Sequence, residues 1–145
     1  MKIITPLKPK DYDEFISLLD RVDERADIIE IWLDGIPELD EFLDQFETNK
    51  DNYDYQYIGV CKSISEKGIF EGDIAEKNHM LHQFLRAGGD WVDVDVTQSP
   101  YEMIAALPPD RLWLSFHDFK GVSDELEITL DGMKMMEPYG YKFAV

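Results

Sequence analysis

The sequence has only one cysteine, Cys61, and no long hydrophobic run. A single cysteine cannot form a disulfide within the chain, so the usage favours a reducing, cytoplasmic compartment. A membrane helix requires about 20 consecutive apolar residues, and the first residues, MKIITP, lack the apolar core of a secretory signal. These absences argue against a membrane-spanning protein and against a secreted one.

Basic residues are also scarce. Lys and Arg number 14 against 31 Asp and Glu, which gives a formal net charge of −17. Such a chain should repel nucleic acid and anionic membrane surfaces, so neither is expected as a partner. The acidic residues are interleaved with apolar ones, as in residues 11–15 (DYDEF). This pattern is typical of solvated helix faces and also of adaptation to high salt.

What the sequence does contain is a repeated alternation of short apolar runs and amphipathic segments. The chain has 145 residues, of which 44% are hydrophobic, and this is enough for one domain with a buried core. The runs are rich in β-branched and aromatic residues, with little polar alternation, as expected of parallel strands covered on both faces. They predict strands at residues 2–7, 28–33, 57–61, 91–96, 112–116 and 141–145.

The amphipathic segments between these runs predict five helices. The first two place apolar residues on one face, at positions 15, 16, 19 and 22 and then 39, 42, 43 and 46. The third is predicted to begin at a cap, Asp73, and to stop at the glycines of positions 88 and 89. The fourth is predicted to open with a capping box at Ser99, followed by proline. The fifth should follow Ser123, with Leu126, Leu130 and Met133 on one face, and end near Gly140.

The alternation predicts an α/β protein with a parallel sheet and helical crossovers. Eight such units would need about 200–250 residues, the size of a (β/α)8 TIM barrel. The expected fold is therefore of TIM-barrel type, truncated after the sixth strand, with one partial (β/α) barrel domain over residues 1–145. The alternative is a flavodoxin-like doubly wound sheet, which normally carries a glycine-containing phosphate loop after strand one. Residues 5–9 (TPLKP) contain no glycine, and this favours the barrel.

Polar residues follow five of the predicted strands at their C-terminal ends, where α/β barrels carry their chemistry. Side chains that converge on one mouth in this way are typical of a binding site. The residues are Glu30, Asp34, Lys62, Glu66, Asp93, Asp95, Ser115, His117, Asp118 and Lys142.

Lys142 and His117 have the most specific chemistry of this set. Lys142 lies in an apolar strand, where burial should lower its pKa and leave a neutral amine that can attack a ketone. The alternative is an exposed lysine near the end of the chain. His117 suits a general acid or base, or a structural role. His79 and His82 are three residues apart on a predicted helix, but further ligands are lacking, so no metal site is predicted.

Five segments together resemble the type I 3-dehydroquinate dehydratases. Their order and spacing agree with that family along essentially the whole chain, and the histidine and lysine segments are the most specific. The segments are 26–34 (ADIIEIWLD), 61–68 (CKSISEKG), 89–95 (GDWVDVD), 114–119 (LSFHDF) and 141–145 (YKFAV).

This resemblance implies a lyase of the shikimate pathway that converts 3-dehydroquinate to 3-dehydroshikimate and water, without a metal or a dissociable cofactor. Lys142 would form a Schiff base with the substrate ketone, and His117 would carry the proton. Glu66 is expected beside His117, where it holds the orientation of the imidazole. Glu30 and Lys62 are expected to bind the substrate.

The chain departs from the family pattern at two positions and lacks its last two strand–helix units. Trp32 and Lys62 stand where the family usually has arginine, and the missing units supply the arginine for the substrate carboxylate. Three hypotheses follow: a dehydratase fragment or split-enzyme half, an inactive relative that binds a metabolite or a protein, and a truncated product without activity. The expected partners are 3-dehydroquinate and either a second copy, in a homodimer, or a complementing chain that supplies the missing strands.

Overall fold

Six parallel strands form one sheet in the computed structural model, which describes residues 2–118, 121 and 126–144. Each strand pairs in parallel with the next along the chain, so the spatial order is the sequence order. A flavodoxin-like sheet places its first strand between the second and the third, and that alternative is therefore wrong. The strands are β1 (Ile4–Leu7), β2 (Ile28–Trp32), β3 (Gln56–Val60), β4 (Trp91–Asp95), β5 (Leu112–His117) and β6 (Gly140–Ala144).

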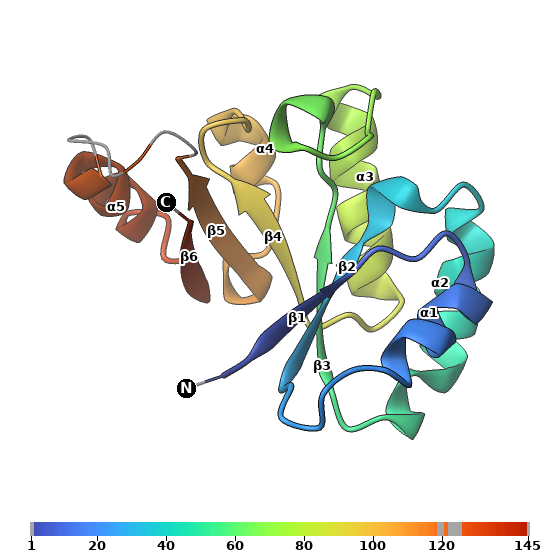
Figure 1. Cartoon of the computed structure of the whole chain (residues 1–145). Helices are drawn as coiled ribbons and strands as arrows, with labels where there is room; N and C mark the ends of the chain where they lie inside the picture. The colour runs from blue at the N-terminus through green and yellow to red at the C-terminus, as the bar shows by residue number, and fades with distance from the viewer. Residues whose placement is uncertain (1, 119–120, 122–125, 145) are drawn as a thin grey trace.

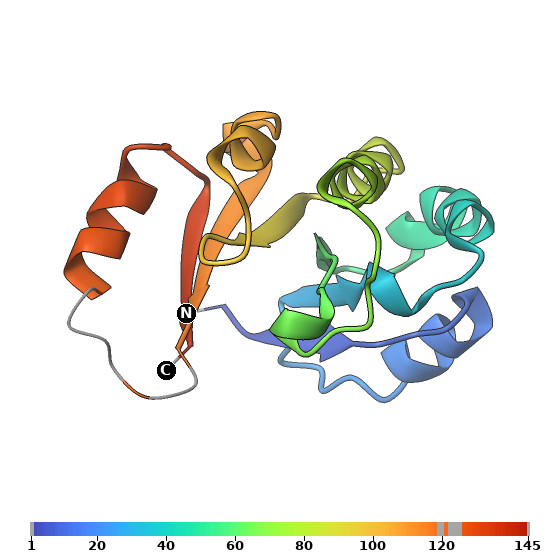
Figure 2. The ribbon, with the colours of Figure 1, turned by 90° about the horizontal axis from the view of Figure 1, so that it is seen from above.

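Five helices connect the strands and lie along the outer side of the sheet (Figure 1). Seen from above, the strands form an arc with the helices outside it (Figure 2). This arrangement is the predicted one, an α/β fold with six strands of a (β/α) barrel. The helices are α1 (Tyr12–Leu19), α2 (Leu39–Asn49), α3 (Ile74–Arg86), α4 (Tyr101–Ala105) and α5 (Leu126–Lys134).

The two faces of the sheet bury different side chains. The outer face and the helices enclose the larger core, in which aromatic rings pack at centroid distances of 5.4 to 6.3 Å. These rings belong to Phe15, Phe42, Phe46 and Phe84. The inner face holds a smaller apolar cluster around Ile28, Ile58, Val60 and Trp91.

The alternation along β4 shows how the inner face becomes polar toward the ends of the strands. Val92 and Val94 point outward into the larger core, whereas Trp91 belongs to the inner cluster. Because side chains alternate along a strand, Asp93 and Asp95 share the inner face with Trp91. Both carboxylates are buried, so they need partners inside the arc. The inner face of the sheet is therefore apolar around Trp91 and polar toward the C-terminal ends of the strands.

Two predicted helix limits differ in the structure. Ser99 does not cap α4, because Pro100 takes the N-cap position with an extended backbone (φ −66°, ψ 153°) and the helix has only five residues. The predicted capping box is therefore wrong. Helix α5 ends at Lys134 and not near Gly140, where β6 already begins. Ser123, the predicted start of the last helix, lies outside the described residues.

Helix α3 has the limits that the sequence predicts. Asp73 accepts a hydrogen bond from the Glu76 backbone, and Glu76 accepts one from the Asp73 backbone, which completes a capping box. Gly88 follows the last turn with a φ of +92°, a conformation that other residues rarely adopt. At 13 residues α3 is longer than the other described helices. In the described part of the chain, no helix is long and apolar enough to cross a membrane.

Candidate active site

The C-terminal ends of the strands surround a cavity of about 310 Å³. The five residues to which the family resemblance assigns a role in catalysis or substrate binding all line it. These side chains come from β2, β5, β6 and the loop after β3, so it is the curl of the sheet that brings them together. They are Glu30, Lys62, Glu66, His117 and Lys142.

Lys142 is held by two carboxylates. Its Nζ donates to Oε2 of Glu30 at 2.5 Å and to Oδ2 of Asp93 at 3.3 Å. Glu30 precedes Lys142 by 112 residues, and only the curved sheet brings β2 and β6 within reach. The two carboxylate side chains are 5% and 1% exposed, whereas that of Lys142 is 28% exposed. Lys142 is therefore the most accessible side chain of this group.

The pKa of Lys142 is raised above the ordinary lysine value. Burial by itself lowers this pKa, but the carboxylates of Asp93 and Glu30 stabilise the ammonium and outweigh it. The predicted fall in pKa is therefore wrong, because the apolar strand conceals two acidic side chains that face the amine. At neutral pH the amine is protonated, and a nucleophilic role requires a proton acceptor. Glu30 Oε2 is in position to be that acceptor.

Trp32 engages the second oxygen of Glu30. Its indole Nε1 donates to Glu30 Oε1 at 3.0 Å, so the carboxylate is held at both oxygens. Above the indole ring lies Lys8, whose Nζ is 3.5 Å from the ring centroid. This separation is well within the range of a cation–π contact. Lys8 and Trp32 both line the cavity.

The imidazole of His117 is oriented by Asp95. Nδ1 lies 2.5 Å from Asp95 Oδ2, and the other oxygen of Asp95 accepts from the backbone N and from Oγ1 of Thr97. Burial raises the pKa of Asp95, but the hydrogen bonds from His117 and Thr97 bring it below its usual value. An ionised Asp95 favours the tautomer that carries its proton on Nδ1, which directs proton exchange with a ligand to Nε2.

Glu66 is held by lysine. Its Oε2 accepts from Lys77 Nζ at 2.6 Å, and Lys62 Nζ lies 3.7 Å from Oε1. The family resemblance places Glu66 beside His117, but the carboxylate that accepts the hydrogen bond from the imidazole Nδ1 is that of Asp95 on β4. The physical reason is local: the 3-10 turn η3 (Ile64–Glu66) forms a capping box through Glu66, and the buried Lys77 fixes the same oxygen.

A tight loop after β3 carries Lys62 and Glu66 to the cavity. Asp34 accepts from the backbone N of Lys62 at 3.1 Å and from that of Ile69 at 3.0 Å, so it joins both ends of the loop. The chain folds back so closely that a Cβ added at Gly68 would lie 1.9 Å from the carbonyl oxygen of Lys62. Glycine at this position is therefore a requirement of the loop.

Several residues of the site have no role assigned by the sequence analysis. Asp93 and Asp95 stand among the polar strand-end residues, but nothing in the sequence indicates which cation each one meets. Lys77 does leave a signal, because it lies four residues before the buried Leu81 and therefore interrupts the apolar stripe of α3. Lys8 leaves none, since its contact depends on where β1 meets β2.

No metal centre is visible in the part of the chain that the structure describes. There, no group of three or more His, Cys, Asp or Glu side chains is arranged to hold an ion. His79 is exposed and His82 is half-buried on α3.

Comparisons with known proteins point to one family. The sequence model described as type I 3-dehydroquinase matches residues 3–145. A 3-dehydroquinate dehydratase of Desulfotalea psychrophila is 26% identical over 111 residues, which cover 72% of this chain and 46% of that protein. One from Coxiella burnetii is 24% identical over 142 residues, covering 93% and 58%. The chain thus spans about half the length of these curated relatives.

Two solved structures share the fold. A crystal structure of type I 3-dehydroquinate dehydratase from Clostridium difficile, with covalently modified comenic acid, has a TM-score of 0.80 and 19% identity, and the match covers 98% of this chain and 62% of that one. A phosphoenolpyruvate phosphomutase from Streptomyces platensis subsp. rosaceus has a TM-score of 0.67 and 12% identity, with 99% and 55% covered. At these identities the likeness concerns the fold alone.

Proposed function

This chain belongs to the type I 3-dehydroquinase family, and from that membership we propose that its cavity is a 3-dehydroquinate dehydratase site that works through a Schiff base on Lys142. The observation that supports the proposal is that a lysine amine and an oriented imidazole line the same cavity. Lys142 lies between Glu30 and Asp93, and His117 is hydrogen-bonded to Asp95. An amine and an oriented imidazole are the two groups that such a dehydration requires.

The reaction can be written with these groups alone. Lys142 gives a proton to Glu30, attacks the ketone of 3-dehydroquinate and forms the imine with loss of water. The protonated imine withdraws electrons, so the neighbouring C–H becomes acidic, and His117 takes that proton through Nε2. The same imidazole then protonates the departing hydroxyl group, which leaves as water. Hydrolysis of the imine releases 3-dehydroshikimate and restores the amine.

The remaining site residues act on these two groups or on the substrate. Asp95 positions His117 and stabilises the imidazolium that forms when it takes the proton. Glu30, fixed by Trp32, binds substrate hydroxyl groups in addition to receiving the proton of Lys142. Lys62 binds the substrate from the loop after β3, and Glu66 contributes by holding Lys62 in the cavity.

Borohydride added together with 3-dehydroquinate should trap a covalent adduct on Lys142, which peptide mass mapping will locate. Because the pKa of Lys142 is raised, the neutral amine is a minor form at pH 7, and the trapping rate should rise as the pH is increased above neutral. Lys62 lines the same cavity and is the internal control. An adduct on Lys62, or one that survives Lys142→Met, would rule out Lys142 as the nucleophile.

A second candidate function is a catalytically inactive relative that binds a metabolite or a protein. The raised pKa of Lys142 favours it, because an ion-paired ammonium is a poor nucleophile. The two candidates differ in one measurement. An inactive metabolite-binding protein would bind 3-dehydroquinate reversibly and give no adduct with borohydride at any pH at which it stays folded.

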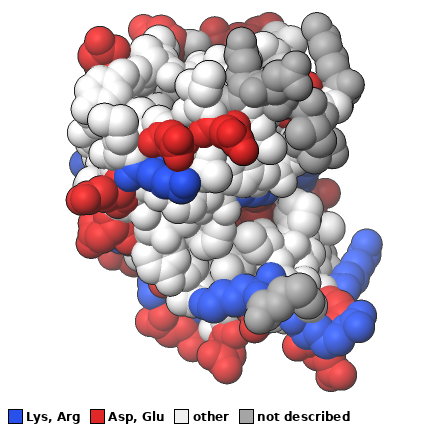
Figure 3. All heavy atoms as spheres, turned by 90° about the vertical axis from the view of Figure 1, so that its left-hand side faces the viewer, with Lys and Arg blue, Asp and Glu red and all other residues white. Residues whose placement is uncertain are grey.

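We also propose that residues 1–145 associate through the flank formed by α5 and β6, either with a second copy or with a complementing chain. Much of this face is uncharged (Figure 3), and several large apolar side chains on it are exposed. These are Ile128, Met135, Tyr141 and Phe143. Such a surface, beside an edge strand, is typical of an interaction site.

Light scattering should therefore find a species of two chains or more at micromolar concentration. Lys substitutions at Ile128 and Met135, which are 76% and 86% exposed, should shift it to one chain without unfolding it. Ile69→Lys is the matched control, because Ile69 is 66% exposed in the loop after β3. A parent protein that stays a single chain at all concentrations would contradict the proposal.

A further inference from the structure

The lining of the cavity is richer in lysine than the chain as a whole. The sequence has 14 basic residues against 31 acidic ones. Yet four lysines line this cavity together with only three carboxylates. The lysines are Lys8, Lys62, Lys67 and Lys142, and the carboxylates are those of Glu30, Glu66 and Asp95. A concentration of cations in so acidic a chain is a feature that attracts an anionic ligand.

The three carboxylates are already engaged by groups other than Lys8. Glu30 is held by Lys142 and by Trp32. Glu66 is held by Lys77, which lies behind the cavity wall, and Asp95 by His117. Each carboxylate of the lining therefore already has a hydrogen-bond partner.

Lys8 and Lys62 are two lysines of the lining that these contacts leave available to a ligand. Lys62 is 4% exposed, but no hydrogen bond from its Nζ joins the described residues, and its paired oxygen, Oε1 of Glu66, is 3.7 Å away. A buried ammonium with so distant a counter-charge gains from an anion placed nearby. Lys8 has no carboxylate partner among the residues that the structure describes, and its Nζ rests on the Trp32 ring at 3.5 Å.

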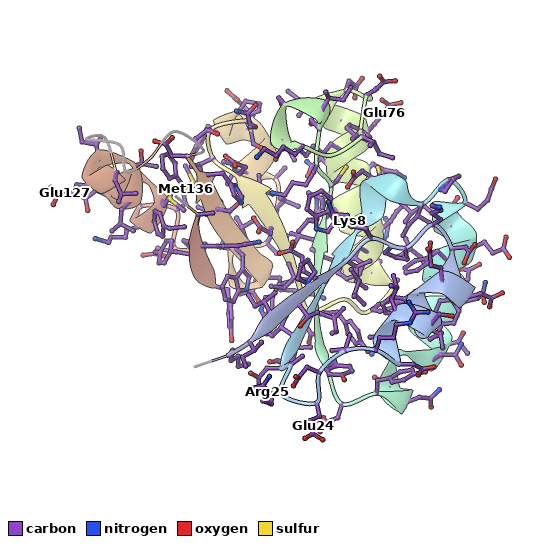
Figure 4. The ribbon with its side chains drawn as sticks, in the orientation of Figure 1. Lys8, Glu24, Arg25, Glu76, Glu127 and Met136 are labelled. Carbon is purple, nitrogen blue, oxygen red and sulfur yellow. The ribbon has the colours of Figure 1, made fainter. Side chains whose placement is uncertain are left out.

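The sheet register places these two cations at one side of the mouth. Leu7 pairs with Ile31, so Lys8 follows β1 at the level of Trp32. Trp32 in turn pairs with Val60, two residues before Lys62. The order across the mouth is thus Lys8, Trp32 and Lys62, from three neighbouring strands. Figure 4 labels Lys8 where β1 ends, over this mouth.

Lys8 is also pre-positioned, although it is an exposed lysine. A free lysine side chain loses conformational entropy when it binds a ligand. Here the cation–π contact restrains Nζ, and the indole beneath it is itself fixed by the hydrogen bond from Nε1 to Glu30. Substitution of Lys8 should leave the fold intact, because its side chain packs on the surface of the site and not in either core cluster.

We propose that Lys8, seated on Trp32, and the buried Lys62 form an anion subsite that takes the carboxylate of a small hydroxylated ring acid. The choice of this ligand class rests on the proposed function, whereas the subsite itself rests on the charges and contacts above. A ligand bound in this way has its carboxylate at β1 to β3, and its ring lies between this side of the mouth and the side that carries Lys142 and His117. The cavity, at about 310 Å³, is at the lower end of the size range of small-molecule sites and suits a single ring.

The test uses quinate, a hydroxylated cyclohexane carboxylate without a ketone, and its methyl ester, which differs from it in charge. Both are titrated at low, constant ionic strength while the indole N–H signals of the three tryptophans are followed by NMR. Quinate should displace the Trp32 signal and bind about three- to tenfold more tightly than the ester. Lys8→Gln should abolish that preference and Lys8→Arg should restore it.

Lys134→Gln is the matched control, because it removes the same charge from an exposed position on α5 and should keep the preference. Equal binding of acid and ester, no displacement of the Trp32 signal by quinate, or a preference that survives Lys8→Gln would each overturn the subsite. The test is independent of imine chemistry, since quinate cannot form an imine. A preference for the acid without any borohydride adduct from 3-dehydroquinate would contradict the dehydratase proposal and support the subsite. An adduct on Lys142 without a preference for the acid would support the dehydratase proposal and contradict the subsite.

Discussion

Replacing His117 by alanine should lower the turnover of 3-dehydroquinate by about 100- to 10,000-fold in any preparation that dehydrates it, because acid–base assistance has that magnitude. The imidazole is the group that the proposed mechanism uses twice, first as base and then as acid. Its Nδ1 is occupied by Asp95, so the loss concerns proton transfer at Nε2. The measurement is kcat from the absorbance of the conjugated product.

Borohydride trapping separates this role from a purely structural one. His117→Ala should still form the adduct on Lys142, since imine formation needs the amine and not the imidazole. Asp95→Asn, which keeps a hydrogen-bonding side chain but removes the charge beside Nδ1, should cause a smaller loss and change the pH profile of kcat. Where turnover is too slow to follow, deuterium uptake next to the ketone in D2O reports the same proton transfer. Activity within about threefold of the parent, against the expected range, would remove His117 from the mechanism.

The strands could be predicted because each one is a short apolar run that a parallel sheet covers on both faces. All six predicted strands are present, with limits that differ by at most two residues. The failed capping box at Ser99 has a local cause, because proline itself took the N-cap position there. Local sequence patterns were thus enough to predict the order of strands and helices, and that order was enough to predict a fold of the barrel type.

For the site, the sequence predicted which single residues take part but not which residues contact one another. Polar residues at the ends of apolar strands identify Glu30, His117 and Lys142, because few other reasons place charge there. Their partners were not predictable, since the contact between Lys142 and Glu30 spans 112 residues and depends on the curvature of the sheet. The sign of the pKa shift at Lys142 failed for the same reason. Burial could be inferred from the sequence, but the two facing carboxylates could not.

Glu66→Gln should destabilise the protein by about 3–5 kcal/mol, the usual cost of removing one partner from a buried ion pair. Glu66 is the counter-charge for two buried lysines, Lys77 at 2.6 Å and Lys62 at 3.7 Å, and all three side chains are less than 8% exposed. Glutamine keeps the shape of the side chain but leaves both ammonium groups without a negative partner. Urea unfolding followed by tryptophan fluorescence gives the free energy difference.

The matched control is Glu71→Gln, which makes the same change at an exposed position nearby and should alter the free energy of unfolding by less than about 0.5 kcal/mol. The double variant Glu66→Gln/Lys77→Met should recover most of the lost stability, because methionine removes the buried charge and keeps a long side chain between α3 and the loop after β3. Recovery would identify the Lys77 pair as the source of the loss. A loss no larger than that of Glu71→Gln would mean that water reaches these ammonium groups, and Glu66 would then hold neither Lys62 nor the loop that presents it.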